Sequence, residues 1–315
     1  MNTLSIELDR YLAIRRSLGF DLRSSERVLR RFIAFAEQER SELITTDLFL
    51  RWQKVFGHAH RGTWAARLGM VRLFAQWLHG MDVRHEVPPK SLIPSPCRRP
   101  RPYIYSEAEI EQLINAAANL PSVNGIRGLT FATFFGLIAV TGLRISEAIA
   151  LDVEDVDLES GVLTIRRAKL SKERLVPVSQ STLASLAAYA KERDRLLGLR
   201  PESFFVKDRG GRPTDCCVRY NFAVVCQSIG LRTGQKMHRH GRGPRIHDLR
   251  HTFAVRTMLN WYRAAKDASR EMIQLSTYLG HVEPANTYWY IEAVPELLEL
   301  ASKRSCVAME QEERS

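Results

Sequence analysis

The chain of 315 residues is longer than most single domains, and 45% hydrophobic residues are enough to build two cores. Its net charge of +11 and pI near 9.7 favour a polyanionic partner, nucleic acid before membrane, because lysines and arginines that neutralise phosphates release condensed counterions. Five cysteines at irregular spacing, with no C-x-x-C pair and no secretory signal, exclude a disulfide-rich secreted protein. We therefore expect a globular, cytoplasmic protein with reduced thiols.

Residues 1–85 are predicted to form a domain of four helices. Apolar residues return every three or four positions in four successive stretches, which is the pattern of amphipathic helices. Ser24 and Ser25 precede the second stretch, and Thr45 and Thr46 precede the third. Their hydroxyls can accept hydrogen bonds from free backbone N–H groups, so we expect them to act as N-caps.

Residues 86–103 are predicted to be an interdomain linker. They contain six prolines, which cannot continue a helix and keep the chain extended. Arg98, Arg99 and Arg101 in this linker are equally compatible with solvated charges and with contacts to a phosphate backbone.

Residues 104–315 are predicted to form a second, mainly helical domain that contains a small antiparallel sheet. A capped helix begins near Ser106, and the apolar stretch from Gly128 to Leu143 is a buried helix, because it is shorter than a membrane span. Alternating patterns in residues 161–167 and 173–179 predict two strands of a β-hairpin. Further helices are expected at 181–197, 214–229, 248–260, 269–278 and onward to residue 303.

Several charged residues of this domain are candidates for a phosphate-binding site. His247 and Arg250 are three residues apart, so on a helix both face one side, where an imidazole and a guanidinium can grip one phosphate. Arg144 begins another predicted helix, and Glu147 one turn later can hold its guanidinium. Lys169 lies in the hairpin turn, from which a flexible amine can reach a cleft. Taken singly, each is also explained as an ordinary surface charge.

Five short segments follow one another in an informative order. They are TGLRISEAIAL, a hairpin with AKLSKERLVPV, HDLRHTFA, LGH, and a tyrosine nine residues after that last histidine. This order resembles the tyrosine recombinase family, also called the phage integrase family, over about residues 103–303. The resemblance implies a mainly helical fold with an N-terminal core-binding domain and a C-terminal catalytic domain. It also implies a set of catalytic residues: Arg144, Lys169, His247, Arg250, His281 and Tyr290.

Two positions in this set have neighbours that compete for the same role. The family's nucleophile stands nine residues after the histidine of LGH, which indicates Tyr290, whereas Tyr288 faces another side of the same helix and is expected to pack. The family's hairpin lysine usually lies between glycines, but Lys169 lies between an alanine and a leucine, so Lys172 stays open as its substitute. The basic segment of residues 232–245 is expected to be an enlarged loop.

The chemistry implied by the resemblance is a transesterification on DNA. Tyr290 would attack a phosphodiester, the two arginines would bind its non-bridging oxygens, and the two histidines would donate hydrogen bonds or take up the tyrosine proton. Lys169 would protonate the departing 5′-hydroxyl. The resulting 3′-phosphotyrosyl ester allows strands to be rejoined without a nucleotide cofactor.

The resemblance also implies double-stranded DNA recombination sites as partners, with a dimer on each site, a homotetramer on two sites and room for an accessory protein. No membrane partner, cofactor or metal is expected, because the cysteine and histidine spacings match no common zinc pattern and no nucleotide-binding glycine motif is present.

Two alternatives remain, a type IB topoisomerase-like relaxing enzyme and a catalytically silent DNA-binding protein. The complete set of pocket residues disfavours the second. Integration, excision and resolution of a mobile element or replicon all fit the chemistry.

Overall fold

The computed structural model describes residues 3–94, 101–166, 173–235, 238–264, 266–280, 287–290, 294–300 and 302. The chain forms two compact units, Met1–Pro100 and Arg101–Ser315. Each unit has a hydrophobic core of its own. Within the ranges just given, no helix is both long enough and apolar enough to cross a membrane.

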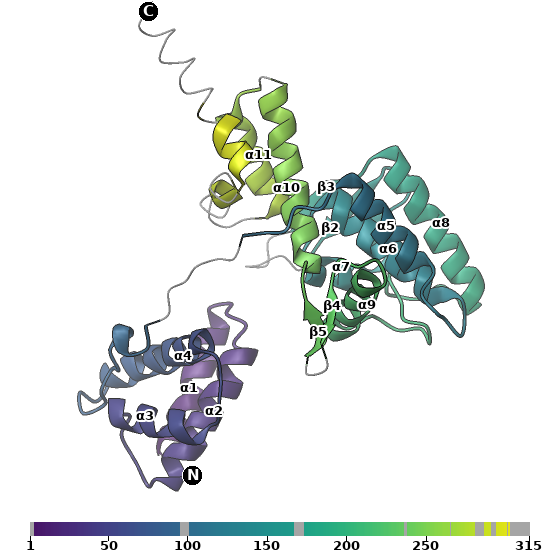
Figure 1. Cartoon of the computed structure of the whole chain (residues 1–315). Coiled ribbons are helices and arrows are strands. Elements are labelled where there is room, and N and C mark those ends of the chain that lie inside the picture. The colour runs from purple at the N-terminus through teal and green to yellow at the C-terminus, as the bar shows by residue number, and fades with distance from the viewer. Residues whose placement is uncertain are drawn as a thin grey trace, which may run out of the picture. The chain divides into compact units, whose positions relative to one another are not determined.

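The first unit is a bundle of helices (Figure 1). Its elements are α1 (Thr3–Ser17), α2 (Arg23–Gln38), α3 (Thr46–Val55), α4 (Arg61–His79) and the short 3-10 helix η1 (Lys90–Leu92). Aromatic rings fill the space between the helices: the ring centroids of Trp52 and Trp64 lie 5.3 Å apart in an edge-to-face arrangement. Phe32 and Phe49 are fully buried beside them.

The chain after α4 also packs on this bundle. The backbone N–H of Glu86 donates to the carbonyl of Ile44 at 2.8 Å, and Ile93 is buried in the core. The described part of the segment predicted to be a linker is therefore attached to the first unit up to residue 94.

The predicted N-caps of this unit have different outcomes. Thr45 caps α3, since its hydroxyl accepts from the N–H of Leu48 at 3.0 Å. The prediction for Ser24 and Ser25 is wrong, because α2 begins at Arg23 and both serines lie inside its first turn. The carboxylate of Asp21 precedes the helix instead and accepts from the N–H of Arg23 at 3.2 Å.

The second unit consists mainly of helices. They are α5 (Glu107–Ala118), α6 (Ile126–Thr141), α7 (Ile145–Ala150), α8 (Gln180–Leu197), α9 (Asp215–Ser228), α10 (Ile246–Arg263) and α11 (Ala268–Leu279), with the 3-10 helix η2 (Val153–Asp155). The apolar helix α6 lies between α5 and α8 (Figure 1) and buries Phe131, Phe134 and Phe135. Ser106 caps α5 in a capping box with Glu109, as predicted.

Two small antiparallel sheets complete this unit. Strands β1 (Val156–Asp157), β2 (Val162–Ile165) and β3 (Arg174–Pro177) pair in sequence order, and Ile165 lies opposite Arg174. Strands β4 (Thr233–Gln235) and β5 (His238–Arg242) form a hairpin within the segment expected to be a loop. The mainly helical fold with a small antiparallel sheet is thus confirmed, whereas the second hairpin was missed.

Helix α10 runs from the β4–β5 hairpin to the side of α11 (Figure 1). It begins at Ile246, two residues before the predicted start, because Arg245 and Asp248 form a capping box in which the N–H of Arg245 donates to Asp248 at 2.7 Å. His247 and Arg250 consequently both lie in the first turns of one helix.

Candidate active site

Arg144 stands at the start of α7, where Glu147 holds it. Its Nη1 donates to Glu147 Oε1 at 2.7 Å, and its backbone N–H donates to Oε2 at 2.9 Å. Burial would raise the pKa of Glu147, but hydrogen bonds and charge from Arg174 and Arg144 hold this pKa at about 2. The carboxylate is therefore ionised, and 28% of the Arg144 side chain stays open to solvent.

Arg250 is buried on α10 and reaches two helix ends. Its Nη1 donates to the carbonyl of Gly142 after α6 at 2.5 Å, and its Nη2 donates to the carbonyl of Leu279 at 2.7 Å. Burial, and after it the positive charge of Arg144, lowers the pKa of Arg250 to about 10, so the guanidinium is charged at neutral pH. Each of these two arginines keeps further N–H donors, because a guanidinium has five.

Arg174 is a third arginine at this place, and the sequence reasoning did not select it. It lies on β3 and contacts both carboxylate oxygens of Glu147, Nη1 to Oε1 at 2.9 Å and Nη2 to Oε2 at 2.8 Å. Two guanidinium groups thus share one carboxylate, and the charge of that carboxylate also acts on Arg250. The local excess of positive charge suits a bound anion.

His247 lies one helical turn before Arg250. Desolvation by the surrounding protein, and after it the charge of Arg250, lowers the pKa of His247 to about 4. The residue is also exposed to solvent, which screens the charges of the arginines. The imidazole is neutral at pH 7 and can both donate and accept a hydrogen bond.

The two candidate tyrosines, Tyr288 and Tyr290, differ in their surroundings. Tyr288 is 48% exposed, whereas Tyr290 is only 2% exposed and packs with residues of α10 and α11. The hydroxyl of Tyr290 lies 3.1 Å from Nδ1 of His251, and its negative form would raise the pKa of Arg250. Tyr290 is therefore the tyrosine whose hydroxyl lies beside a histidine of α10.

His251 is a second residue that was not selected from the sequence. It follows Arg250 directly on α10, and its ring centroid lies 4.6 Å from that of His247 and 5.4 Å from that of Tyr290. A second histidine one turn after His247 was the available signal. Across the described part of the chain, no group of three or more His, Cys, Asp or Glu is arranged to hold a metal ion.

Two predicted site residues, Lys169 and His281, lie outside the described residues, as does the alternative Lys172. Their flanking positions are described. Arg174 follows the hairpin turn closely, and Gly280 directly precedes His281. The carbonyl of Gly280 accepts from Arg144 Nη2 at 2.7 Å.

The sequence matches the phage integrase family over residues 104–296, which covers the arginine cluster, both α10 histidines and Tyr290. The chain belongs to this family. It is a tyrosine-type site-specific recombinase, and proteins of similar sequence are named integrases or tyrosine recombinases. A putative integrase/recombinase y4rB of Sinorhizobium fredii is 40% identical over 309 residues, 96% of this chain and 97% of the relative. The tyrosine recombinase XerD of Caulobacter vibrioides is 30% identical over 240 residues, 75% of this chain and 72% of the relative.

Solved structures share the fold of this recombinase. The Tn1549 transposon integrase in complex with a circular intermediate DNA superposes with a TM-score of 0.64 at 17% identity, covering 95% of this chain and 99% of that one. A lambda integrase dimer bound to a core site gives a TM-score of 0.60 at 16% identity, covering 91% of this chain and 94% of that one. At these identities the likeness supports the fold alone.

Proposed function

We propose that this recombinase cuts and rejoins double-stranded DNA through a 3′-phosphotyrosyl bond to Tyr290. The observation that carries the proposal is the placement of the Tyr290 hydroxyl beside His251 and within the electrostatic reach of Arg250. A tyrosine is a weak nucleophile near neutral pH, so it needs a proton acceptor and a site that stabilises the attacked phosphate. In this proposal His251 is the proton acceptor, and the arginines form the site that stabilises the phosphate.

The arginines supply the phosphate site in this proposal. Arg144 and Arg250 each use two nitrogens on protein oxygens and present the remaining N–H donors to the non-bridging phosphate oxygens. Because the protein contacts fix both guanidinium groups before DNA arrives, little reorganisation is needed in the transition state.

The proton of Tyr290 passes to an imidazole nitrogen. His251 Nδ1 lies within hydrogen-bond distance of the hydroxyl, so it is the direct acceptor, while His247 and His281 donate hydrogen bonds to the phosphate. The new bond joins Tyr290 Oη to phosphorus as the bond from phosphorus to the 5′-oxygen breaks.

The departing 5′-oxygen takes a proton from a lysine, Lys169 or its alternative Lys172. A 5′-bridging phosphorothiolate separates the two, because its sulfur leaves without needing a proton. The lysine whose alanine variant regains cleavage on this DNA is the general acid. An alanine variant of Arg144 should not be rescued, since the non-bridging oxygens still need their donors.

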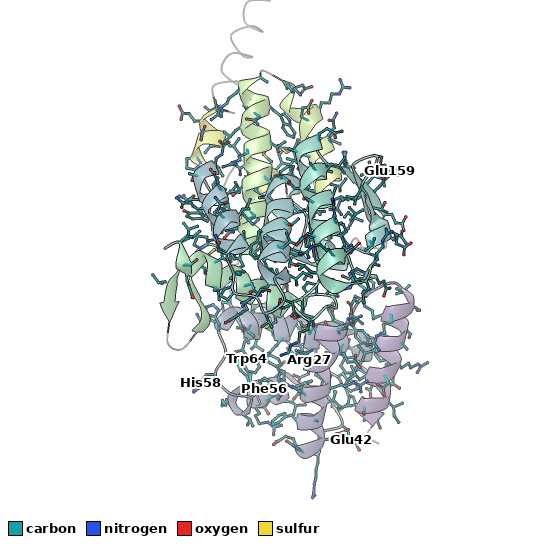
Figure 2. The ribbon with its side chains drawn as sticks, turned by 90° about the vertical axis from the view of Figure 1, so that its right-hand side faces the viewer. Arg27, Glu42, Phe56, His58, Trp64 and Glu159 are labelled. Carbon is teal, nitrogen blue, oxygen red and sulfur yellow. The ribbon has the colours of Figure 1, made fainter. Side chains whose placement is uncertain are left out.

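The first unit is proposed to be the core-binding domain that holds the duplex. The guanidinium carbon of Arg67 lies 4.4 Å from the ring centroid of Phe56 and 4.5 Å from that of Trp64. Both aromatic side chains are labelled in Figure 2. Arg30 is a poorer candidate for a phosphate contact, because it is ion-paired with acidic neighbours. Arg27 and Arg31, which are exposed on the same helix α2, are better candidates.

The assembly proposed is a dimer on each DNA site and a homotetramer on two sites. One related solved structure is a lambda integrase tetramer bound to a Holliday junction, and another is a transposon integrase on transposon end DNA. We infer by analogy a role in integration, excision or resolution of a mobile element.

The proposal is tested on duplexes selected by binding from a randomised library. A nicked form of the selected duplex should trap a covalent adduct that carries the strand ending in the 3′-phosphate and releases a 5′-hydroxyl. Plasmids with two selected sites should then recombine. Relaxation of supercoils without recombination would favour the topoisomerase-like alternative, and binding without an adduct would favour a silent DNA-binding protein.

A further inference from the structure

The C-terminal end of α11 is held by arginine side chains from other elements. The last carbonyls of a helix have no partner within the helix and must be satisfied from outside. Here three consecutive carbonyls each accept from a different arginine. The pairs are Arg174 Nε to Tyr278 at 2.9 Å, Arg250 Nη2 to Leu279 at 2.7 Å and Arg144 Nη2 to Gly280 at 2.7 Å.

Arg174 differs from the other two in how its donors are used. Its Nε, Nη1 and Nη2 are all engaged, with the carbonyl of Tyr278 and with both oxygens of Glu147. It therefore presents little to a DNA phosphate. Any effect of Arg174 on DNA cleavage must therefore act through Glu147 and the backbone of α11, which it contacts.

Those groups belong to segments that carry proposed site residues. Glu147 shares its Oε1 between Arg174 and Arg144, so the position of one guanidinium depends on the other. The carbonyl of Tyr278 lies three residues before His281. Arg174 itself opens β3, two positions after Lys172 and five after Lys169 in the sequence.

We propose that Arg174 is a positioning residue of the strand-transfer site, which fixes Arg144 through the shared carboxylate and anchors the end of α11 before His281. The inference rests on the proposed function and goes beyond it, since Arg174 touches none of the reacting atoms. Without it, Glu147 is a buried carboxylate with Arg144 as its remaining arginine partner. That arginine is then drawn toward the carboxylate and away from the phosphate.

The chain offers a matched control for the test. Arg212 likewise joins a carboxylate, that of Asp152, to backbone carbonyls, those of Ile149 and Leu151, in the same unit. Removal of the Arg212 guanidinium breaks the same kinds of hydrogen bond, to a carboxylate and to backbone carbonyls, but outside the arginine cluster. Comparison of Arg174→Gln with Arg212→Gln therefore separates positioning from general stability.

Cleavage and binding are measured separately on the nicked selected duplex. At saturating protein, the single-turnover rate of Arg174→Gln should fall by about tenfold to a hundredfold, as expected for a displaced catalytic group. Its DNA affinity, measured with Tyr290→Phe added to block cleavage, should change by less than about threefold. Arg174→Lys should fall between wild type and Arg174→Gln, because a lysine replaces the charge but not the planar fork. Arg212→Gln should cleave at close to the wild-type rate.

Amide exchange supplies a readout that does not depend on cleavage. Arg174→Gln should speed exchange in the last turn of α11 by about tenfold through easier local opening, and Arg212→Gln should not. Equal cleavage rates in the two variants, or unchanged exchange in α11, would overturn the inference. A wild-type chain that forms no adduct through Tyr290 would instead contradict the proposed function, and the exchange result would still decide the anchoring of α11.

Discussion

Arg144 and Arg250 are each placed to bind protein oxygens and a ligand at the same time. Each guanidinium binds protein oxygens through two nitrogens and keeps donors for a ligand. A lysine in either place supplies a point charge that cannot bridge protein and phosphate in a fixed plane. Geometry should therefore matter as much as charge.

The first prediction concerns this geometry. Arg144→Lys and Arg250→Lys should each slow single-turnover cleavage by on the order of a hundredfold, the cost of losing one transition-state donor. Rates are measured on the nicked selected duplex at saturating protein. A lysine variant that cleaves at the wild-type rate would contradict a bidentate phosphate clamp.

Glu147 leads to a prediction about pH. Its pKa in the folded protein, about 2, is below the ordinary value of 4.5, so its stabilisation is present above about pH 4.5 and is lost as the pH falls toward 2. Glu147→Gln should lower the free energy of unfolding at pH 7 by on the order of 3 kcal/mol, and the gap to wild type should narrow below pH 4.5. Chemical denaturation at a series of pH values measures both curves.

Glu159, an exposed glutamate seen in Figure 2, provides the control. Glu159→Gln should follow the wild-type stability curve throughout. If Glu147→Gln did the same, the carboxylate would not be held by the arginines in solution.

The sequence was sufficient to select several residues that the structure places close to one another. Arg144, His247, Arg250 and Tyr290 come from three separate segments, and the charges of Arg250 and Arg144 both lower the pKa of His247. Arg174 was not found, because a single arginine in a short strand looks like an ordinary solvent-facing charge until the packing shows it buried. Local pattern says nothing about the end of α11, which lies a hundred residues away.

At the scale of elements, the site depends on how helices end. α6 and α11 are each followed by a glycine in the left-handed conformation, Gly142 with φ 62° and Gly280 with φ 65°. This conformation turns the backbone sharply, and the carbonyls at these ends accept from the arginines. At Gly280 an added Cβ would lie 2.9 Å from Arg174 Nη1 and 3.4 Å from Arg144 Nη1.

Gly280→Ala should therefore disturb the arginines as well as strain the backbone. The matched control is Gly198→Ala at the end of α8, where φ is 67° and nothing lies within 4 Å of the added Cβ. Both variants should lose about 1 kcal/mol of stability from backbone strain alone. Only Gly280→Ala should also slow cleavage, by about tenfold or more, because it displaces catalytic groups. Equal cleavage in both variants would mean that this glycine serves the turn alone.

Helices and strands could be predicted where the periodicity of apolar residues was strong. The helices of both units and the first hairpin have clear apolar periodicity. The β4–β5 hairpin was missed because its strands, TGQ and HRHGR, lack an apolar alternation. The start of α2 was misplaced because a serine that could cap a helix was preferred to the aspartate that precedes the helix.

At the scale of the whole molecule, two units and a charge of +11 fit a protein that holds DNA by its backbone. Affinity for the selected duplex should fall by on the order of a thousandfold between about 50 and 200 mM salt, which corresponds to roughly six neutralised phosphates. Fluorescence anisotropy at several salt concentrations measures the slope. An affinity almost independent of salt would contradict phosphate-dominated binding and would indicate that base contacts dominate.

The central claim is that Tyr290 is the nucleophile, and one measurement tests it most directly. Tyr290→Phe and Tyr288→Phe are each incubated with the nicked selected duplex, and covalent protein–DNA adducts are separated on a denaturing gel. Because Tyr290 faces His251 whereas Tyr288 is half exposed, Tyr290→Phe should bind the duplex and form no adduct, and Tyr288→Phe should form the adduct as wild type does. An adduct with Tyr290→Phe, or its loss in Tyr288→Phe alone, would contradict the account.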